Sequence, residues 1–165
     1  MYFNRLNRKK SACIHNSRVS IFAALLKNMV YITRREQFSA AHKLVREDWS
    51  AEKNLEIFGK CASPNWHGHN YQLFVTVKGE QNPETCFVAN LSDASKIICE
   101  KVISKLDHKN INLDVDFMKG KLSTTETLAV EIWKQLEASI KKLGCELHCV
   151  KIQETENNYV EYFGK

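Results

Sequence analysis

Three histidines form the pattern in this sequence that is best suited to chemistry. His67 and His69 are separated by one residue in the segment HGHNYQLFVTVK, and His42 ends an earlier segment, FSAAH. Residues two apart on a β-strand point to the same face, about 7 Å apart along the chain, so His67 and His69 would present two imidazoles side by side. A third histidine from a neighbouring strand would complete a face of three nitrogens, which suits Zn²⁺ with an open fourth position. The alternative is that His67 and His69 are two solvent-facing histidines. The spacing of the residues alone does not place His42 beside them.

Two residues close to these histidines fit such a site. Gly68 has no side chain, so a metal ion or a substrate could approach the backbone there. Cys61 lies six residues before His67, and a thiol beside a bound cation ionises more readily, which would make it a base or a nucleophile. The alternative for Cys61 is a small buried apolar residue, as most free cysteines are. The same bland interpretation applies to Cys86, Cys99, Cys145 and Cys149.

Further acids and bases lie in two polar turns. Asp107 and His108 follow each other in LDHKN, where a carboxylate could orient an imidazole for proton transfer. Adjacent side chains seldom touch, so the alternative is a histidine stabilised by the end of a helix. Glu154 ends an apolar stretch in KIQETENN and could pair with a guanidine-like edge through two parallel hydrogen bonds. The default for such a glutamate is exposure to solvent.

Strands are predicted where apolar and β-branched residues alternate. Val30–Ala41 and His67–Lys78 are the first two, and Glu146–Glu154 and Tyr159–Phe163 are the last two. The connection Lys43–Trp66 is long and polar, and a connection of that length in a small domain is usually functional.

Two helices are predicted between these strands. One begins near Ser92–Asp93 and runs to about Leu106. The other begins at the capping box STTE, in which the Ser123 side chain accepts from the backbone N–H of Glu126. Its apolar stripe is Leu128, Ile132, Leu136 and Ile140, and Gly144 follows its end. This order of elements predicts an α+β fold with the helices on one face of an antiparallel sheet.

Composition limits the classes of protein that are possible. The 165 residues predict one domain, and no apolar run is long enough to span a membrane. Six of the 24 basic residues lie in residues 1–28, which contain no acid, and the remaining 18 are balanced by 19 acidic residues. A nucleic-acid binder needs its positive charge on the folded surface, so no nucleic-acid partner is expected. The six cysteines form no C-x-x-C pair, which favours a reduced, intracellular chain.

The first 28 residues differ from the rest of the chain. They are basic and contain one short apolar run, Ile21–Leu26. They predict a dispensable extension, with a mitochondrial presequence and a weak signal peptide as alternatives. We therefore expect one domain over residues 29–165 and a cytoplasmic protein, with mitochondrial import the less favoured location.

Five segments of the chain, taken together, resemble the family of 6-pyruvoyl-tetrahydropterin synthases. They are FSAAH, NLEIFGKCASPNWHGHNY, LDHKN, STTE and QETENN, which follow in the family's order over residues 30–165. The resemblance implies the T-fold, a four-stranded antiparallel sheet with two helices on one face. It also implies that three subunits form a β-barrel and that two trimers form a homohexamer with sites between subunits.

The resemblance implies a role for each candidate residue. His42, His67 and His69 would hold one Zn²⁺ per subunit. Cys61 would abstract a proton, and His108, supported by Asp107, would relay it from a neighbouring subunit. The pterin would be anchored by Glu154, helped by the backbone and hydroxyls around Thr124, Thr125 and Glu126.

The implied enzyme is a carbon–oxygen lyase of tetrahydrobiopterin biosynthesis. It converts 7,8-dihydroneopterin triphosphate to 6-pyruvoyl-5,6,7,8-tetrahydropterin and releases triphosphate without an external redox cofactor. Mg²⁺ can accompany the triphosphate, and the sequence does not choose among Lys60, Lys43 and Arg35 as its partners.

Two alternatives stay open at this point. One is 6-carboxy-tetrahydropterin synthase of the queuosine route, in which three residues typically separate the cysteine from HGH, whereas five intervene here. The other is a non-catalytic protein that binds zinc or pterin on the same fold.

Overall fold

The computed structural model describes residues 28–165, so the expectations for Cys13 and for the extension before Asn28 lie outside the described residues. The strands are β1 (Val30–His42), β2 (His67–Gly79), β3 (Lys109–Asn110), β4 (Glu146–Gln153) and β5 (Tyr159–Tyr162). The helices are α2 (Ala51–Phe58), α3 (Leu91–Ile98), α4 (Ser104–Leu106) and α5 (Thr125–Lys141), with a π-helical segment at Cys99–Ile103 and 3-10 turns at Gly59–Ala62 and Asp116–Met118.

The strands form one sheet in the order β3-β1-β2-β4-β5. All four predicted strands are present, but the expected count of four is wrong because β3 adds a short fifth strand parallel to β1. Its backbone is fixed on either side of the strand, where the N–H of His108 donates to Ser39 O at 2.7 Å and that of Ile111 donates to Ala41 O at 2.8 Å. A two-residue strand in a polar turn carries no alternation, so the sequence gives no signal for it.

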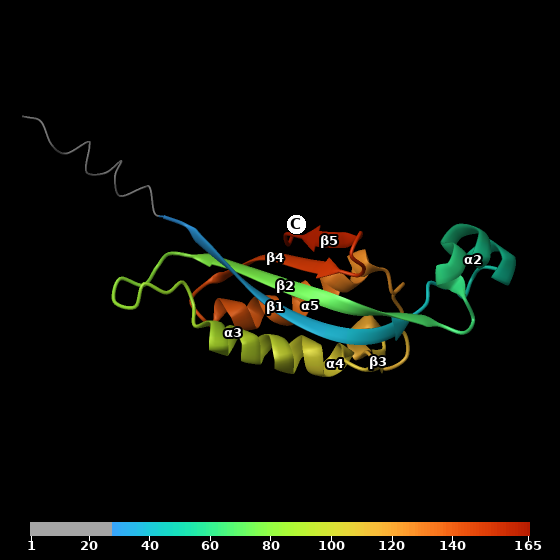
Figure 1. Ribbon diagram of the computed structural model, residues 1–165, viewed down its shortest axis with the longest axis horizontal. Helices are drawn as coiled ribbons and strands as arrows, with labels where there is room; N and C mark the ends of the chain where they lie inside the picture. Colours follow the sequence, from blue (N-terminus) through green and yellow to red (C-terminus); the bar gives the residue numbers. More distant parts are fainter. Residues whose placement is uncertain (1–27) are drawn as a thin grey trace, which may run out of the picture.

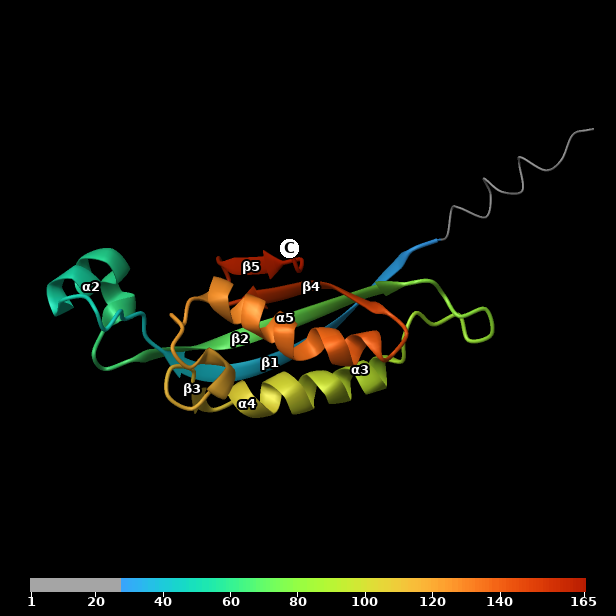
Figure 2. The ribbon, with the colours of Figure 1, turned by 180° about the vertical axis from the view of Figure 1, so that it is seen from behind.

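Both long helices cover the same face of the sheet, as the α+β prediction requires. Figure 2 shows α5 and the α3–α4 segment in front of the sheet, and Figure 1 shows that no helix within residues 28–165 covers the other face. The core lies between these layers. The predicted stripe of α5 is fully buried in it, with Leu128, Ile132, Leu136 and Ile140 at most 1% exposed.

The start of α5 differs from the prediction by one residue. Thr124, not Ser123, is the N-cap, and its hydroxyl accepts from the backbone N–H of Thr127 at 3.2 Å. Ser123 is buried, and its hydroxyl donates toward Lys43 O at 2.9 Å. The predicted capping box with Glu126 is therefore wrong, because the Ser123 hydroxyl bonds the backbone of Lys43 and does not cap the helix.

The first predicted helix is interrupted in the middle. It starts at Leu91, where the side chain of Asn90 accepts from Ser92 N at 2.9 Å, and its second half begins with the π-helical segment at Cys99–Ile103. A π turn takes up one more residue than an α turn. The apolar positions still reach the core, since Ile98, Val102 and Leu106 are all 0% exposed.

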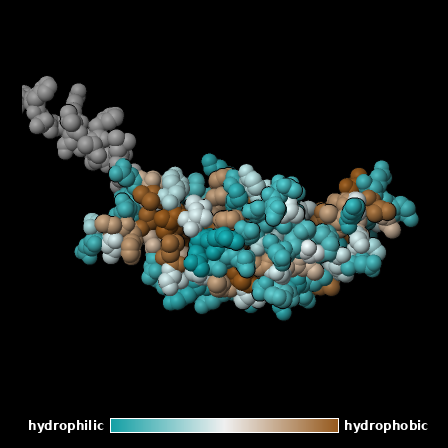
Figure 3. All heavy atoms as spheres, in the orientation of Figure 1, coloured by the Kyte–Doolittle hydropathy of each residue, from teal (hydrophilic) through white to brown (hydrophobic). Residues whose placement is uncertain are grey.

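The polar connection between β1 and β2 contains a helix that the sequence did not predict. In α2, Ser50 caps the backbone N–H of Lys53, and buried Asn54 bonds both the N–H and the carbonyl of Arg46. Leu55 and Ile57 are 61% and 57% exposed, so α2 lacks the buried apolar stripe from which a helix is predicted. Figure 3 shows hydrophobic atoms on the surface over α2 and over the start of β1.

Among the described residues, no helix is long and apolar enough to cross a membrane.

Candidate metal centre and adjoining pocket

The end of β1 and the start of β2 bring the three predicted histidines together. In the antiparallel register His42 lies opposite His67, and Ala40 lies opposite His69, so all three imidazoles share the face that carries the helices. One nitrogen from each ring lies within 4.8 Å of the other two. The sequence could place His67 and His69 on one face, whereas the strand pairing supplies His42.

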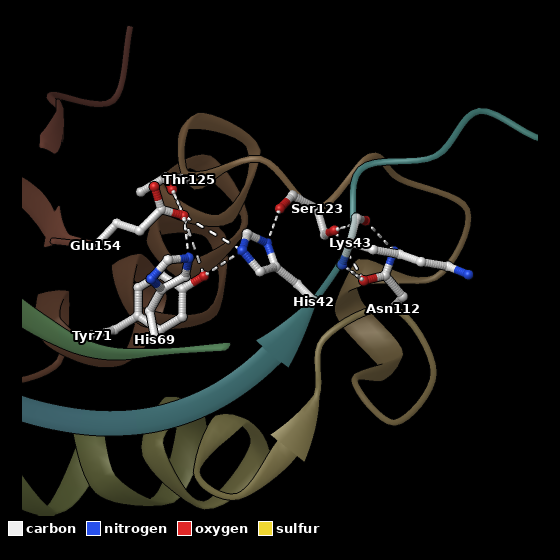
Figure 4. Close-up of polar contacts among 8 residues, drawn as sticks. All are labelled: His42, Lys43, His69, Tyr71, Asn112, Ser123, Thr125 and Glu154. Atoms are coloured by element: carbon white, nitrogen blue, oxygen red, sulfur yellow. Dashed lines mark hydrogen bonds and ion pairs between the residues drawn. The ribbon is translucent and has the colours of Figure 1, made fainter. Parts of the chain in front are cut away.

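His42 is oriented by a hydrogen bond on the far side of its ring. Its Nδ1 lies 2.8 Å from Ser123 O, and because a carbonyl only accepts, Nδ1 carries the proton and Nε2 offers a lone pair. Asn112 steadies this arrangement, since its Oδ1 accepts from Lys43 N at 3.1 Å and from the Ser123 hydroxyl at 3.0 Å (Figure 4). Such partners fix the tautomer of metal-ligating histidines.

His67 provides an independent test of whether the site fits a metal ion. Its Nδ1 is buried and has no hydrogen-bond partner among the residues that the structure describes. A buried nitrogen without a partner is costly, and a bound cation would satisfy it. Burial lowers the pKa of His42 and of His67, and the neighbouring imidazoles lower both further. Both rings are therefore neutral at physiological pH, which is the form that binds metal.

Gly68 is required for a reason other than the one the sequence suggested. A Cβ at Gly68 would lie 2.9 Å from the backbone oxygen of Ala40, too close for any side chain. Gly68 alternates with His67 and His69 and so faces the opposite side of the sheet. Gly68 therefore points away from the imidazoles, and its absent side chain permits the close pairing of β1 and β2.

A cavity of about 600 Å³ opens beside His42 and contains most of the other predicted site residues. Its lining includes Cys61, from the 3-10 turn after α2, and Glu154, from the turn after β4. The start of α5 contributes Thr124, Thr125 and Glu126. Cys61 is a free cysteine that is partly buried. A candidate base, hydroxyl groups and a carboxylate thus surround one cavity at the edge of the histidine cluster.

Glu154 was expected by default to be exposed to solvent, but in the structure its carboxylate contacts several side chains. Its Oε1 accepts from the Thr125 hydroxyl at 2.9 Å and lies 3.6 Å from His42 Nε2 and 3.8 Å from His69 Nε2. The Tyr71 hydroxyl also reaches Oε1, at 3.4 Å (Figure 4). Nothing in the local sequence distinguishes Tyr71 from a core aromatic residue, so its contact with Glu154 is not predicted from the sequence.

Asp107 and His108 touch each other, contrary to the usual behaviour of adjacent residues. His108 has φ 56°, in the left-handed region, and its Nδ1 lies 2.9 Å from Asp107 Oδ2. Asp107 Oδ1 in turn accepts from Ser39 N at 2.9 Å, and this bond together with that to His108 lowers the pKa of the Asp107 carboxyl. His108 lines a second hollow, with Gly68 and Asn70, and not the cavity of Cys61. One chain therefore does not bring Cys61 and His108 together.

The three basic residues considered for phosphate are dispersed. The Lys43 ammonium lies 4.3 Å from the centre of the Trp66 ring. Lys60 is exposed beside Cys61, and Arg35 is exposed in the middle of β1.

Comparisons with known proteins agree with this geometry. A family profile described as 6-pyruvoyl tetrahydropterin synthase matches residues 31–165. The 6-pyruvoyl tetrahydrobiopterin synthase of Homo sapiens is 46% identical over 134 residues, which cover 81% of this chain and 91% of that protein. A solved structure of 6-pyruvoyl tetrahydropterin synthase from Caenorhabditis elegans aligns with a TM-score of 0.78 at 36% identity, covering 83% of this chain and 96% of that one.

The rival pterin enzyme is also a relative, at lower identity. The 6-carboxy-5,6,7,8-tetrahydropterin synthase of Bacillus subtilis is 30% identical over 129 residues, which cover 75% of this chain and 78% of that protein. The identity therefore favours the 6-pyruvoyl enzymes.

Proposed function

The chain belongs to the 6-pyruvoyl tetrahydropterin synthase family, and from that premise we propose that it is a lyase that converts 7,8-dihydroneopterin triphosphate to 6-pyruvoyl-5,6,7,8-tetrahydropterin with release of triphosphate. The observation that carries the proposal is a cluster of three histidine nitrogens whose member His42 also lines a cavity with Cys61 and Glu154. We place this activity in residues 29–165.

The metal is proposed to be Zn²⁺, one per subunit, on His42, His67 and His69. Three neutral imidazoles with an open fourth position are the donor set of catalytic zinc sites. Zn²⁺ held there would act as a Lewis acid toward the hydroxyl oxygens of the substrate side chain, which makes the adjacent C–H more acidic. Mg²⁺ can accompany the triphosphate as its counterion.

The protein's own groups handle the ring and the proton. Glu154 holds the 2-amino and ring N–H edge of the pterin, with Thr124, Thr125 and Glu126 beside it, because its carboxylate lies at the cavity and can accept paired hydrogen bonds. The Cys61 thiolate removes the proton from the side-chain carbon, and the pair Asp107–His108 accepts it and returns it to the product. Loss of triphosphate and tautomerisation complete the reaction without an oxidant or a reductant.

The site is proposed to be shared between subunits of a homohexamer, formed as a dimer of trimers. In a single chain, His108 lines a different hollow from the cavity that Cys61 lines. Leu55 and Ile57 on α2 and Tyr159 on β5 are large, exposed apolar residues, and none of the helices that the structure describes covers the second face of the sheet. These surfaces suit contacts with further copies of the chain.

Mixing two inactive variants tests whether the site is shared. Cys61→Ala and His108→Ala should each be inactive alone, and chains of both kinds assembled together in equal amounts should recover roughly a quarter of the wild-type activity, since one shared site in four would contain both intact groups. Steady-state assays after co-expression measure this recovery. Mixed oligomers with no recovered activity would place both residues in the same chain's site or outside the mechanism.

Product analysis tests the activity itself. Purified protein is incubated with 7,8-dihydroneopterin triphosphate and the pterin is identified by mass, with triphosphate measured in parallel. The 6-pyruvoyl product with one triphosphate per turnover is expected. A 6-carboxy product would establish the rival enzyme, and binding without turnover would establish a non-catalytic pterin protein.

A further inference from the structure

One hydroxyl group joins the metal centre to the carboxylate at the cavity. Tyr71 is 1% exposed, and its ring stacks on Phe38 with centroids 4.9 Å apart and planes at 17°. The core therefore fixes where the ring lies. Its hydroxyl is within 3.2 Å of His42 Nε2 and 3.4 Å of Glu154 Oε1 (Figure 4).

The chemistry of this hydroxyl limits which contact it keeps. A phenol carries its proton at neutral pH, so it donates one hydrogen bond. Nε2 of His42 is the nitrogen left for a metal, because Nδ1 is held by Ser123 O. Once that lone pair is used, Glu154 is the acceptor left for Tyr71 among these neighbours. Thr125 already donates to the same oxygen at 2.9 Å, so the carboxylate would be held by donors from a strand and a helix.

We propose that Tyr71 is a positioning residue for substrate recognition, which holds the Glu154 carboxylate in the orientation that pairs with the pterin ring. This inference rests on the proposed function, in which Glu154 anchors the pterin. The long contact of 3.4 Å is one that substrate binding can tighten, since catalytic hydrogen bonds are often loose before the substrate arrives.

Tyr71→Phe tests the role because it removes the hydroxyl and keeps the ring against Phe38. A hydrogen bond from a neutral donor to a carboxylate predicts a rise of about tenfold in KM, and in the Kd for neopterin measured by fluorescence. We expect kcat to change by less than about twofold, since the group orients the substrate and touches no reacting atom. Bound zinc per chain should be unchanged. Tyr162→Phe is the matched control. Tyr162 lies on β5, where its ring packs on Trp133 of α5, and its substitution should alter none of these values.

A double variant separates positioning from a general effect on the pocket. If Tyr71 acts through Glu154, then adding Tyr71→Phe to Glu154→Gln should leave neopterin affinity where Glu154→Gln alone puts it. Independent, additive losses would overturn the proposal, as would wild-type KM and Kd in Tyr71→Phe. Loss of zinc from Tyr71→Phe would also overturn it, by assigning the hydroxyl to the metal centre. Failure of the wild-type protein to turn over the substrate would instead refute the proposed function.

Discussion

Replacing His67 with alanine is expected to abolish metal binding and turnover together. His67 contributes one of three nitrogens that lie within 4.8 Å of one another, and its buried Nδ1 has no partner among the described residues. Changing a residue that only supports a ligand costs about 10- to 100-fold in metal affinity, so loss of a ligand should cost more than that. Zinc per chain after dialysis, measured beside kcat, is the direct readout.

A second histidine provides the control for that experiment. His148 lies on β4, where its ring contacts Tyr31 and Phe163 and not the cluster. His148→Ala should keep its zinc and its activity. Normal zinc content in His67→Ala would refute the three-histidine site, because the remaining pair would then be sufficient.

Replacing Cys61 with alanine should retain zinc and lose turnover. Cys61 lines the cavity beside His42, whereas the group of residues that could hold the ion consists of the three histidines. Removal of a general base lowers the rate by about 10²- to 10⁴-fold. We expect kcat to fall by this amount while zinc per chain and neopterin affinity stay at wild-type values.

Cys86 offers a matched comparison, since it is an exposed thiol away from the cavity. Cys86→Ala should leave kcat unchanged. If Cys61→Ala instead loses its metal, Cys61 is a ligand and its assignment as the base is wrong.

The sequence predicts the parts of this molecule whose periodicity is strong. The alternation in HGHNYQLFVTVK predicts β2 and places His67 and His69 on one face, and the stripe from Leu128 to Ile140 predicts α5. These predictions are confirmed because burial of one face selects a repeating pattern that can be read locally. By contrast, α2 exposes Leu55 and Ile57 and shows no such pattern.

Long-range contacts explain what the sequence could not predict. The partner that orients His42 is the backbone carbonyl of Ser123, 81 residues away, and a carbonyl has no residue-type signal. Glu154 and Tyr71 meet across 83 residues, although each alone resembles an ordinary strand residue. The resemblance to a family supplied the roles that local patterns left open, and the structure adds the contacts of His42, Tyr71 and Glu154.

Metal analysis of the purified wild-type protein asks whether the three histidines hold a zinc ion. We expect about one zinc per chain, because the three ligands form one site. Chelation should remove the metal and the activity together, and added Zn²⁺ should restore both. A fully active protein that contains no transition metal and does not respond to added Zn²⁺ would refute the proposed zinc site.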